Sequence, residues 1–213
     1  MLNRAVTIAP NDALVWYQLG IVHSSAGREQ EAIAAFEKAT ALDPDMAEAH
    51  SLLGAALAAS GDLERGQREL SRALEINPDL PEALGNLGHL LAARGENLQA
   101  VFYFARSVQL KPNDADVRTN YAVALAGLGR LEEARKQIDA AIQGDASSAD
   151  AHNFRGILLE RQGRPAEALS EFLEAIRLRP TFGRAHLNAA RILDVMGDHA
   201  GAEEQRRRAV ARN

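Results

Sequence analysis

The sequence predicts an all-α fold, a right-handed α-solenoid (superhelix) of antiparallel helix pairs with a period of about 34 residues. Two observations predict it. Six of the 16 glycines stand at one constant spacing, which sets this period: Gly27, Gly61, Gly95, Gly129, Gly163 and Gly197. Five of the seven prolines keep the same spacing: Pro10, Pro44, Pro78, Pro112 and Pro180. A fixed period of this length is typical of proteins whose units stack on their neighbours into one continuous core.

Each repeat is expected to begin with a helix, helix A, directly after the periodic proline position. The residue that follows this position always has a short polar side chain, which can accept a hydrogen bond from the free N–H groups of a helix. These predicted caps are Asn11, Asp45, Asp79, Asn113, Ser147 and Thr181. The periodic glycine then supplies the left-handed conformation that commonly ends a helix.

A second helix, helix B, is expected after the glycine. In the first repeat Ala32, Phe36 and Ala39 recur at spacings of three and four residues, which places one apolar stripe along a helix. One position in the middle of helix A stays small in every repeat, although glycine costs about 1 kcal/mol in a helix interior. Close crossing of the paired helices explains this pattern. The residues are Gly20, Gly54, Gly88, Ala122, Gly156 and Ala190.

The first repeat resembles the tetratricopeptide repeat family, with His23 in place of the usual aromatic residue. The matching positions are Trp16, Leu19, Gly20, Ala32, Phe36, Ala39 and Pro44. The pattern predicts one superhelical domain over residues 1–213, in which residues 1–12 are part of helix B of a preceding unit. Its repeats are 13–46, 47–80, 81–114, 115–148 and 149–182, with a sixth, capping repeat at 183–213. The resemblance implies that helix A of every unit lines the concave side.

Composition and charge argue against several functional classes. The chain has 24 Lys and Arg against 29 Asp and Glu, a net charge of −5, which is the wrong sign for binding a nucleic-acid backbone. It has no cysteine, so neither disulfides nor thiolate metal sites are expected. No apolar stretch is long enough to span a membrane, and the N-terminus does not resemble a secretory signal. A cytoplasmic location is expected, with the periplasm as the alternative.

Residues for catalysis or metal binding are not expected. The spacings of phosphate-binding loops, nucleophile elbows and zinc-binding helices do not occur. His50, His152 and His186 share the position of Trp16 in different repeats, which indicates packing residues because no third ligand accompanies them. The chain is therefore predicted to be no enzyme and to need no metal or cofactor.

The face of helix A that points away from its own helix B and from the next repeat is predicted to bind a peptide. Its residues are mostly small or apolar with sparse polar groups, as in a binding groove. The predicted peptide-binding residues are Tyr17, Asn86, His89, Asn120, Asn153, Phe154, Arg184, Asn188 and Arg191.

Three asparagines of this face, Asn86, Asn120 and Asn188, share one position of the repeat. Because an amide both donates and accepts hydrogen bonds, such a ladder can bind a peptide main chain. It resembles the ladder of the tetratricopeptide domain of O-linked N-acetylglucosamine transferase, with interruptions that include Leu52 and Phe154. The alternative is that these asparagines are polar residues of an exposed helix face. The Lys and Asn positions of the family's carboxylate clamp are not matched, so binding of a C-terminal chaperone tail is not expected.

A row of charged residues follows the edge of this face. Glu48, Glu82, Asp116 and Asp150 are expected mainly to cap their helices, and Arg184 takes the same position in the sixth repeat. The row also suggests a ligand. Basic groups would lie near Asp116 and Asp150, an acidic group or terminus near Arg184 and Arg191, and Tyr17 and Phe154 would anchor apolar side chains.

The expected function is that of a non-catalytic protein-interaction scaffold, which binds a peptide or partner segment in its concave groove. Two alternatives stay open. The terminal repeats could extend onto another copy of the chain, which would make it a self-assembling homo-oligomer. The chain could also be the substrate-recruiting region of a larger enzyme, such as a transferase.

Overall fold

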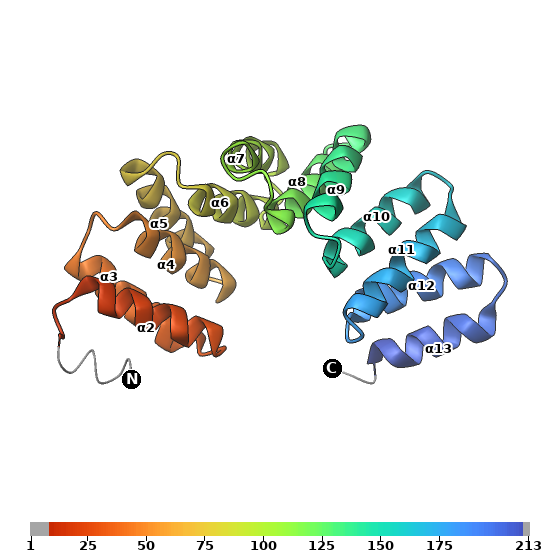
Figure 1. Ribbon diagram of the computed structural model, residues 1–213, viewed down its shortest axis with the longest axis horizontal. Coiled ribbons are helices and arrows are strands. Elements are labelled where there is room, and N and C mark those ends of the chain that lie inside the picture. Colours follow the sequence, from red (N-terminus) through yellow and green to blue (C-terminus); the bar gives the residue numbers. More distant parts are fainter. Residues whose placement is uncertain (1–8, 211–213) are drawn as a thin grey trace. The chain divides into compact units, whose positions relative to one another are not determined.

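The computed structural model describes residues 9–210 of the 213-residue chain. Over these residues it contains twelve α-helices, labelled α2–α13 in Figure 1, and no strand. No helix in this range is long and apolar enough to cross a membrane. The helix expected over residues 1–12 falls mostly on residues 1–8, outside the described residues, and so does the edge through which self-assembly was expected.

The twelve described helices alternate between helix A and helix B of successive repeats. Helices A are α2 (Ala13–Ser25), α4 (Ala47–Ala59), α6 (Pro81–Ala93), α8 (Ala115–Gly127), α10 (Ala149–Arg161) and α12 (Gly183–Val195). Helices B are α3 (Glu29–Leu42), α5 (Leu63–Ile76), α7 (Asn97–Leu110), α9 (Leu131–Gly144), α11 (Pro165–Leu178) and α13 (His199–Val210). Each helix A packs most extensively on the helix B that follows it. The predicted all-α fold of antiparallel helix pairs is confirmed.

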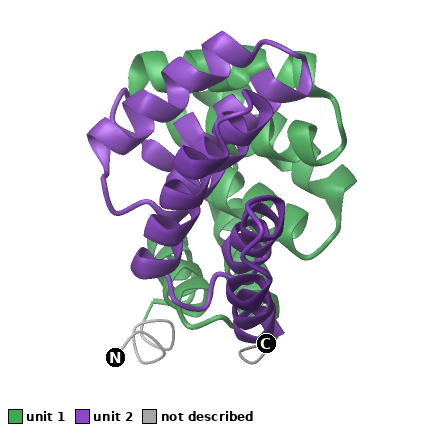
Figure 2. Cartoon of the chain, turned by 90° about the vertical axis from the view of Figure 1, so that its right-hand side faces the viewer, with its two compact units in different colours: residues 1–111 green, residues 112–213 purple. Residues whose placement is uncertain are grey.

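The chain divides into two compact units, which are coloured separately in Figure 2. Unit 1 comprises residues 1–111 and holds helices α2–α7, and unit 2 comprises residues 112–213 and holds α8–α13. Each unit is therefore a stack of three helix pairs within the described part of the chain.

The periodic glycines end helix A as predicted. All six have a positive φ, between 68° and 94°. In the first repeat the Gly27 N–H donates to the Ser24 carbonyl at 3.0 Å, and the Arg28 N–H donates to the His23 carbonyl at 2.9 Å. This bonding pattern satisfies the last free carbonyls of the helix and needs a left-handed residue, which glycine adopts without strain.

The predicted helix caps are wrong by one residue. The N-cap residues are Asp12, Met46, Leu80, Asp114, Ser148 and Phe182. In three repeats the predicted residue lies in a turn that precedes the helix. The Oδ1 atoms of Asp43, Asn77 and Asp145 accept from the N–H two residues later, at 3.1, 3.2 and 2.8 Å. The backbone therefore turns before helix A begins, and the following residue becomes the cap.

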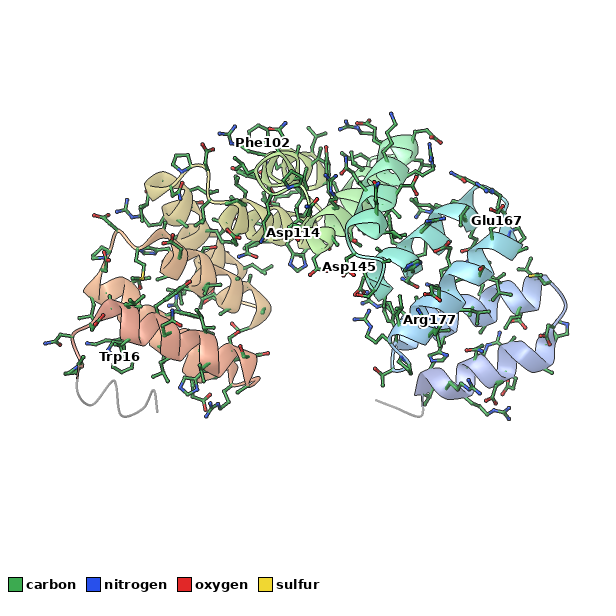
Figure 3. The ribbon with its side chains drawn as sticks, viewed as in Figure 1. Trp16, Phe102, Asp114, Asp145, Glu167 and Arg177 are labelled. Atoms are coloured by element: carbon green, nitrogen blue, oxygen red, sulfur yellow. The ribbon has the colours of Figure 1, made fainter. Side chains whose placement is uncertain are left out.

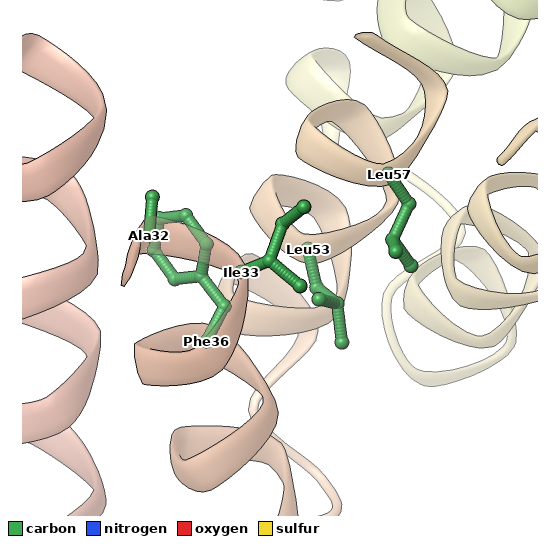
Figure 4. Packing of buried hydrophobic residues seen from close by; sticks show 5 residues of the cluster. All are labelled: Ala32, Ile33, Phe36, Leu53 and Leu57. Carbon is green, nitrogen blue, oxygen red and sulfur yellow. The ribbon is translucent and has the colours of Figure 1, made fainter. Parts of the chain in front are cut away.

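The core of each unit is built on the apolar stripe of helix B. In unit 1, Phe36 of α3 and Leu53 of α4 belong to one buried cluster (Figure 4). The small mid-helix residues allow this packing: a Cβ on Gly156 would lie 2.5 Å from Cε1 of Phe172. The repeat that carries Ala122 in this position has the smaller Ile138 on helix B, and both residues are fully buried. The predicted close crossing of helices A and B is confirmed.

The residues that share the position of Trp16 fasten the start of helix A. The Trp16 Nε1–H donates to the Pro10 carbonyl at 2.8 Å, and the Arg118 Nε–H donates to the Pro112 carbonyl at 2.7 Å. The histidines repeat this arrangement. In His50, Nε2 lies 3.1 Å from the Pro44 carbonyl oxygen and Nδ1 lies 2.7 Å from Oε2 of Glu69 on helix B. These contacts hold helix A against both the preceding turn and its paired helix.

Candidate functional site: a groove on the helix A side of unit 2

The helix A side of unit 2 contains a groove of about 780 Å³, called the unit 2 groove below. Three helices contribute to it, α8, α10 and α12, together with the residue that precedes α12. Its volume lies in the range of about 300–1,000 Å³ that is usual for ligand sites. The lining residues are Asp116, Thr119, Asn120, Val123, Asp150, Asn153, Phe154, Ile157, Phe182, Arg184, Leu187 and Asn188.

Residues three and four apart lie on one face of a helix, so successive turns line the groove with different chemistry. The first turns of the three helices contribute the charged residues Asp116, Asp150 and Arg184. The next turns contribute asparagines and Phe154. The third turns of α8 and α10 are apolar, with Val123 and Ile157. The groove therefore has a charged edge, an amide-rich middle and an apolar edge.

The structure brings five of the predicted peptide-binding residues together in this groove: Asn120, Asn153, Phe154, Arg184 and Asn188. Arg191 does not line it. Its guanidinium pairs with Glu160 of α10 and also donates to Oδ1 of Asn188 at 3.3 Å. The three remaining predicted residues, Tyr17, Asn86 and His89, belong to unit 1.

The groove has three charged side chains, and two of them, Asp116 and Arg184, have no partner among the described residues. The third, Asp150, is paired. Asp150 pairs with Arg179, whose Nη2 lies 2.8 Å from Oδ2, and Arg179 also stacks on the Phe182 ring with its Cζ atom 3.8 Å from the centroid. Asp116 and Arg184 are exposed and form neither an ion pair nor a hydrogen bond within residues 9–210. The groove thus keeps one free carboxylate on α8 and one free guanidinium on α12.

Two of the asparagine amides in the groove are hydrogen-bonded to each other. Nδ2 of Asn188 donates to Oδ1 of Asn153 at 2.9 Å, and Asn153 is only 8% exposed. The Thr119 hydroxyl donates to the Ala115 carbonyl at 2.8 Å. Asn120 is half-buried and has no hydrogen-bond partner in the described part of the chain. It therefore keeps both a donor and an acceptor for a ligand.

The acids at the charged edge do not cap their helices as expected. None of Glu48, Glu82, Asp116 and Asp150 accepts a hydrogen bond from a main-chain N–H of the described residues. Because each helix begins one residue later than predicted, the acid stands at its second position, where it cannot form the reciprocal bond of a capping box. Glu82 instead pairs with Lys111, with Oε1 3.0 Å from Nζ.

In unit 1 the predicted residues have different surroundings. The Tyr17 ring packs on Phe36 with 6.3 Å between centroids, and burial raises the pKa of its phenol, with smaller contributions from Glu48 and Glu82. Nδ2 of Asn86 lies 3.4 Å from Oγ of Ser51, and His89 is exposed. A smaller cavity of about 270 Å³ is lined by Ile21, Ser24, Ser25, Phe36, Leu52, Ala55, Ala56 and Ala59, so it contains none of the three.

The sequence did not place Phe182 in the unit 2 groove. Phe182 precedes α12 at the position that holds the capping residues Asp114 and Ser148 in the two preceding repeats. An aromatic residue where the two preceding repeats have short polar side chains was the available signal. This signal was overlooked because the predicted cap of this repeat was Thr181, one residue before Phe182.

Helix pairs that recur at a constant spacing, with a lined groove on the helix A side, define a helical-repeat interaction protein. Family models described as tetratricopeptide repeat match residues 24–90, 86–151, 119–181 and 155–213. The chain therefore belongs to the tetratricopeptide repeat family, whose members are protein-interaction modules. Among residues 9–210, no three His, Asp or Glu side chains are grouped so that they could hold a metal ion.

Similar solved structures show the same fold. The structure of YrrB, described as a tetratricopeptide repeat protein with an unusual peptide-binding site, is 25% identical, has a TM-score of 0.63 and covers 86% of this chain and 95% of its own. The pilF protein of Pseudomonas aeruginosa is 18% identical with a TM-score of 0.79, covering 91% and 88%. PilW, a type IV pilus biogenesis factor, is 18% identical with a TM-score of 0.81, covering 91% and 90%. A search of curated proteins gave no match.

Proposed function

We propose that this chain is a non-catalytic interaction module that binds an extended peptide segment of a partner protein in the unit 2 groove. The observation that carries the proposal is the combination of side chains there. Free charged and amide groups of Asp116, Asn120 and Arg184 lie in the same groove as the exposed apolar side chains of Val123 and Leu187, which are 45% and 51% exposed. Apolar groups that fix a ligand beside a few polar groups that orient it are typical of binding sites.

The dimensions of the groove suit an extended chain. Packed helices lie about 8–10 Å apart, and an extended peptide rises roughly 3.3 Å per residue. A peptide that crosses from α8 over α10 to α12 therefore needs about six residues. Its main chain would pass Asn120, which keeps a free donor and acceptor, and its side chains would meet Phe154 of α10. The peptide-binding site named in the description of YrrB supports this class of ligand.

The test begins with ligands selected on the protein itself. Random dodecapeptides displayed on phage are selected on the full chain, and the enriched sequences are synthesised and measured by isothermal titration calorimetry. The double variant Asn120→Ala with Phe154→Ala is expected to lose at least about tenfold in affinity, because truncating a central aromatic anchor and an unpaired amide removes about 1.4 kcal/mol or more.

The matched control removes the same two kinds of side chain from a different surface. Gln99 and Phe102 are exposed on helix B of the third repeat, and Figure 3 shows Phe102 projecting from α7. The double variant Gln99→Ala with Phe102→Ala should bind the selected peptides as the wild type does. Equal affinity of the groove variant and the wild type would show that the peptides do not use the unit 2 groove. Circular dichroism of all variants confirms that each is folded.

A further inference from the structure

We infer that the unit 2 groove selects its peptide by the order of two charges, with a basic group opposite Asp116 and an acidic group opposite Arg184. This inference rests on the proposed function and specifies its ligand. The charge pattern predicted from sequence also included Asp150 and Arg191. In the structure Asp150 forms an ion pair with Arg179, and Arg191 forms one with Glu160. Only Asp116 and Arg184 keep their full charge available to a ligand.

The α8 side of the groove suits a basic group. Asp116 and Asn120 stand one helical turn apart and therefore lie on the same face of α8. A carboxylate oxygen and an amide oxygen are both hydrogen-bond acceptors, so an ammonium or guanidinium group between them can donate to each. Neither side chain has a competing partner among residues 9–210.

The α12 side suits an acidic group, because the placement of Arg184 is unfavourable for the helix itself. Arg184 is the second residue of α12, where the positive end of the helix dipole disfavours a cation. The same position holds an acid in each of the four preceding repeats: Glu48, Glu82, Asp116 and Asp150. A carboxylate on the ligand would neutralise Arg184 and interact favourably with the end of α12. Arg184 therefore serves ligand binding in the groove and does not stabilise α12.

Beside its charged edge the groove also offers apolar surface to the ligand. Phe154 and Ile157 of α10 and Leu187 of α12 supply it. The preferred peptide therefore carries a basic side chain and an acidic group about six residues apart, with apolar residues between them. The acidic group can be a side chain or the C-terminal carboxylate, because both present the same two oxygens to a guanidinium.

Pools of synthetic peptides test the charge order on the full chain. Each pool has six positions, with the central four drawn from Leu, Phe, Ser and Asn, and with an acetylated N-terminus and an amidated C-terminus. The end residues are Lys and Glu, Glu and Lys, Lys and Lys, or Glu and Glu. A fifth pool begins with Lys and ends in Gln with a free C-terminal carboxylate. Binding is measured by fluorescence anisotropy in low salt and in 0.5 M NaCl.

One of the two mixed-charge pools, or the fifth pool, should bind about fivefold more tightly than the like-charge pools, because each exposed ion pair adds a factor of up to about five. The preference should shrink in 0.5 M NaCl, since salt screens exposed charges. Preference for the fifth pool would identify a C-terminal carboxylate as the acidic group, and preference for an amidated pool would identify a side chain.

Exchanging the two charges should exchange the preference. The variant Asp116→Lys with Arg184→Glu is expected to favour the mixed pool that the wild type disfavours, and Arg184→Gln alone should lose only the discrimination at the acidic end. The control Glu132→Lys with Lys136→Glu exchanges two exposed charges on α9 at constant net charge and should behave as the wild type.

The possible failures are distinct. Equal binding of all pools, with affinity that still depends on Asn120 and Phe154, would overturn the charge order and leave the proposed function standing. An unchanged preference in the charge-exchange variant would overturn it as well. If no pool binds in a way that depends on the groove residues, the charge order is overturned too, whereas phage-selected peptides that bind independently of Asn120 and Phe154 would overturn the proposed function itself.

Discussion

The helix A sides of the two units use the same positions of the repeat for different surfaces. In unit 1 the cavity beside α2 and α4 measures about 270 Å³, and small or apolar residues such as Ala55 and Leu52 line most of it. In unit 2 the groove measures about 780 Å³ and exposes Asp116 and Arg184. Where unit 1 has a fully covered Ser51, 2% exposed, the last repeat of unit 2 has Leu187, 51% exposed.

This difference shows that stability and recognition depend on separate positions of one repeat. The buried positions barely differ between the units: Phe36 and Phe104 in unit 1 and Phe172 in unit 2 are all at most 2% exposed. The exposed positions of helix A vary freely because the core does not constrain them. Substitutions at buried positions should therefore affect both units alike, whereas substitutions at groove positions should distinguish them.

The largest expected effect concerns the shared core. Phe36→Ala in unit 1 and Phe172→Ala in unit 2 should each lower the free energy of unfolding by about 3–5 kcal/mol, because each leaves a cavity where a fully buried ring was removed. Urea denaturation followed by circular dichroism measures the loss. Phe102→Ala removes the same ring from a site that is 65% exposed and should change stability by about 0.5 kcal/mol or less. A large loss in only one of the units would contradict a common basis for their stability.

These core positions were predictable from the sequence, and the groove was predictable only in part. The periodic glycines and the aromatic stripe recur from repeat to repeat, because each repeat must solve the same packing problem. The free charges of the groove follow no such rule. In the sequence Asp150 and Arg191 look as available to a ligand as Asp116 and Arg184. In the structure, however, Asp150 forms an ion pair with Arg179 and Arg191 forms one with Glu160. These ion pairs depend on side-chain conformations, which periodicity does not determine.

The second prediction concerns the close crossing of helices A and B. Gly156→Ala places a Cβ 2.5 Å from the buried Phe172 ring. Overpacking of this kind costs about 1–3 kcal/mol against a gain of about 1 kcal/mol from replacing glycine in a helix, so a net destabilisation of up to about 2 kcal/mol is expected. The pair Ala122 and Ile138 shows how the clash can be relieved. Adding Phe172→Ile to Gly156→Ala should therefore cost less than the sum of the single substitutions in a double-mutant cycle.

The same cycle in unit 1 checks whether both units obey this packing rule. Gly20 meets Phe36 as Gly156 meets Phe172. Gly20→Ala and Phe36→Ile should show a coupling of the same sign and similar size. Additive effects in either unit would mean that the ring moves away from the added methyl group, and that the glycine is not required for packing.

The third prediction separates the groove of unit 2 from its counterpart in unit 1. Leu52 and Asn86 hold, in unit 1, the repeat position of Asn120 and Phe154. Truncating Leu52 and Asn86 to alanine should leave the affinity for the selected peptides within about twofold, against the loss of at least about tenfold in the unit 2 variant. The reason is that Asn86 is already bonded to Ser51 and Leu52 packs against the core. Calorimetry with the same peptides measures both affinities. Equal losses of affinity in the unit 1 and unit 2 variants would show that the ligand binds both units.

The smallest expected effect is a sensitivity of unit 2 to acid. Its helices carry carboxyl groups with lowered pKa values, including Glu167 and Glu174, where hydrogen bonds from Arg164 and Arg177 favour the charged form. Since their pKa is lower in the folded than in the unfolded chain, they stabilise the fold at neutral pH, and this contribution is lost as the pH falls below the ordinary value of 4.5.

Replacing these two residues should expose that contribution. The variant Glu167→Gln with Glu174→Gln should be slightly less stable than the wild type at pH 7, and the difference should shrink as the pH is lowered from 7 to 3 and the wild-type carboxyls take up protons. Glu29 and Glu64 in unit 1 form no ion pair among residues 9–210, so their replacement by glutamine is the control. Thermal unfolding followed by circular dichroism at both pH values measures the difference. A gap of the same size at pH 3 and at pH 7 would show that the two glutamates stabilise unit 2 by packing of their side chains and not by their charge.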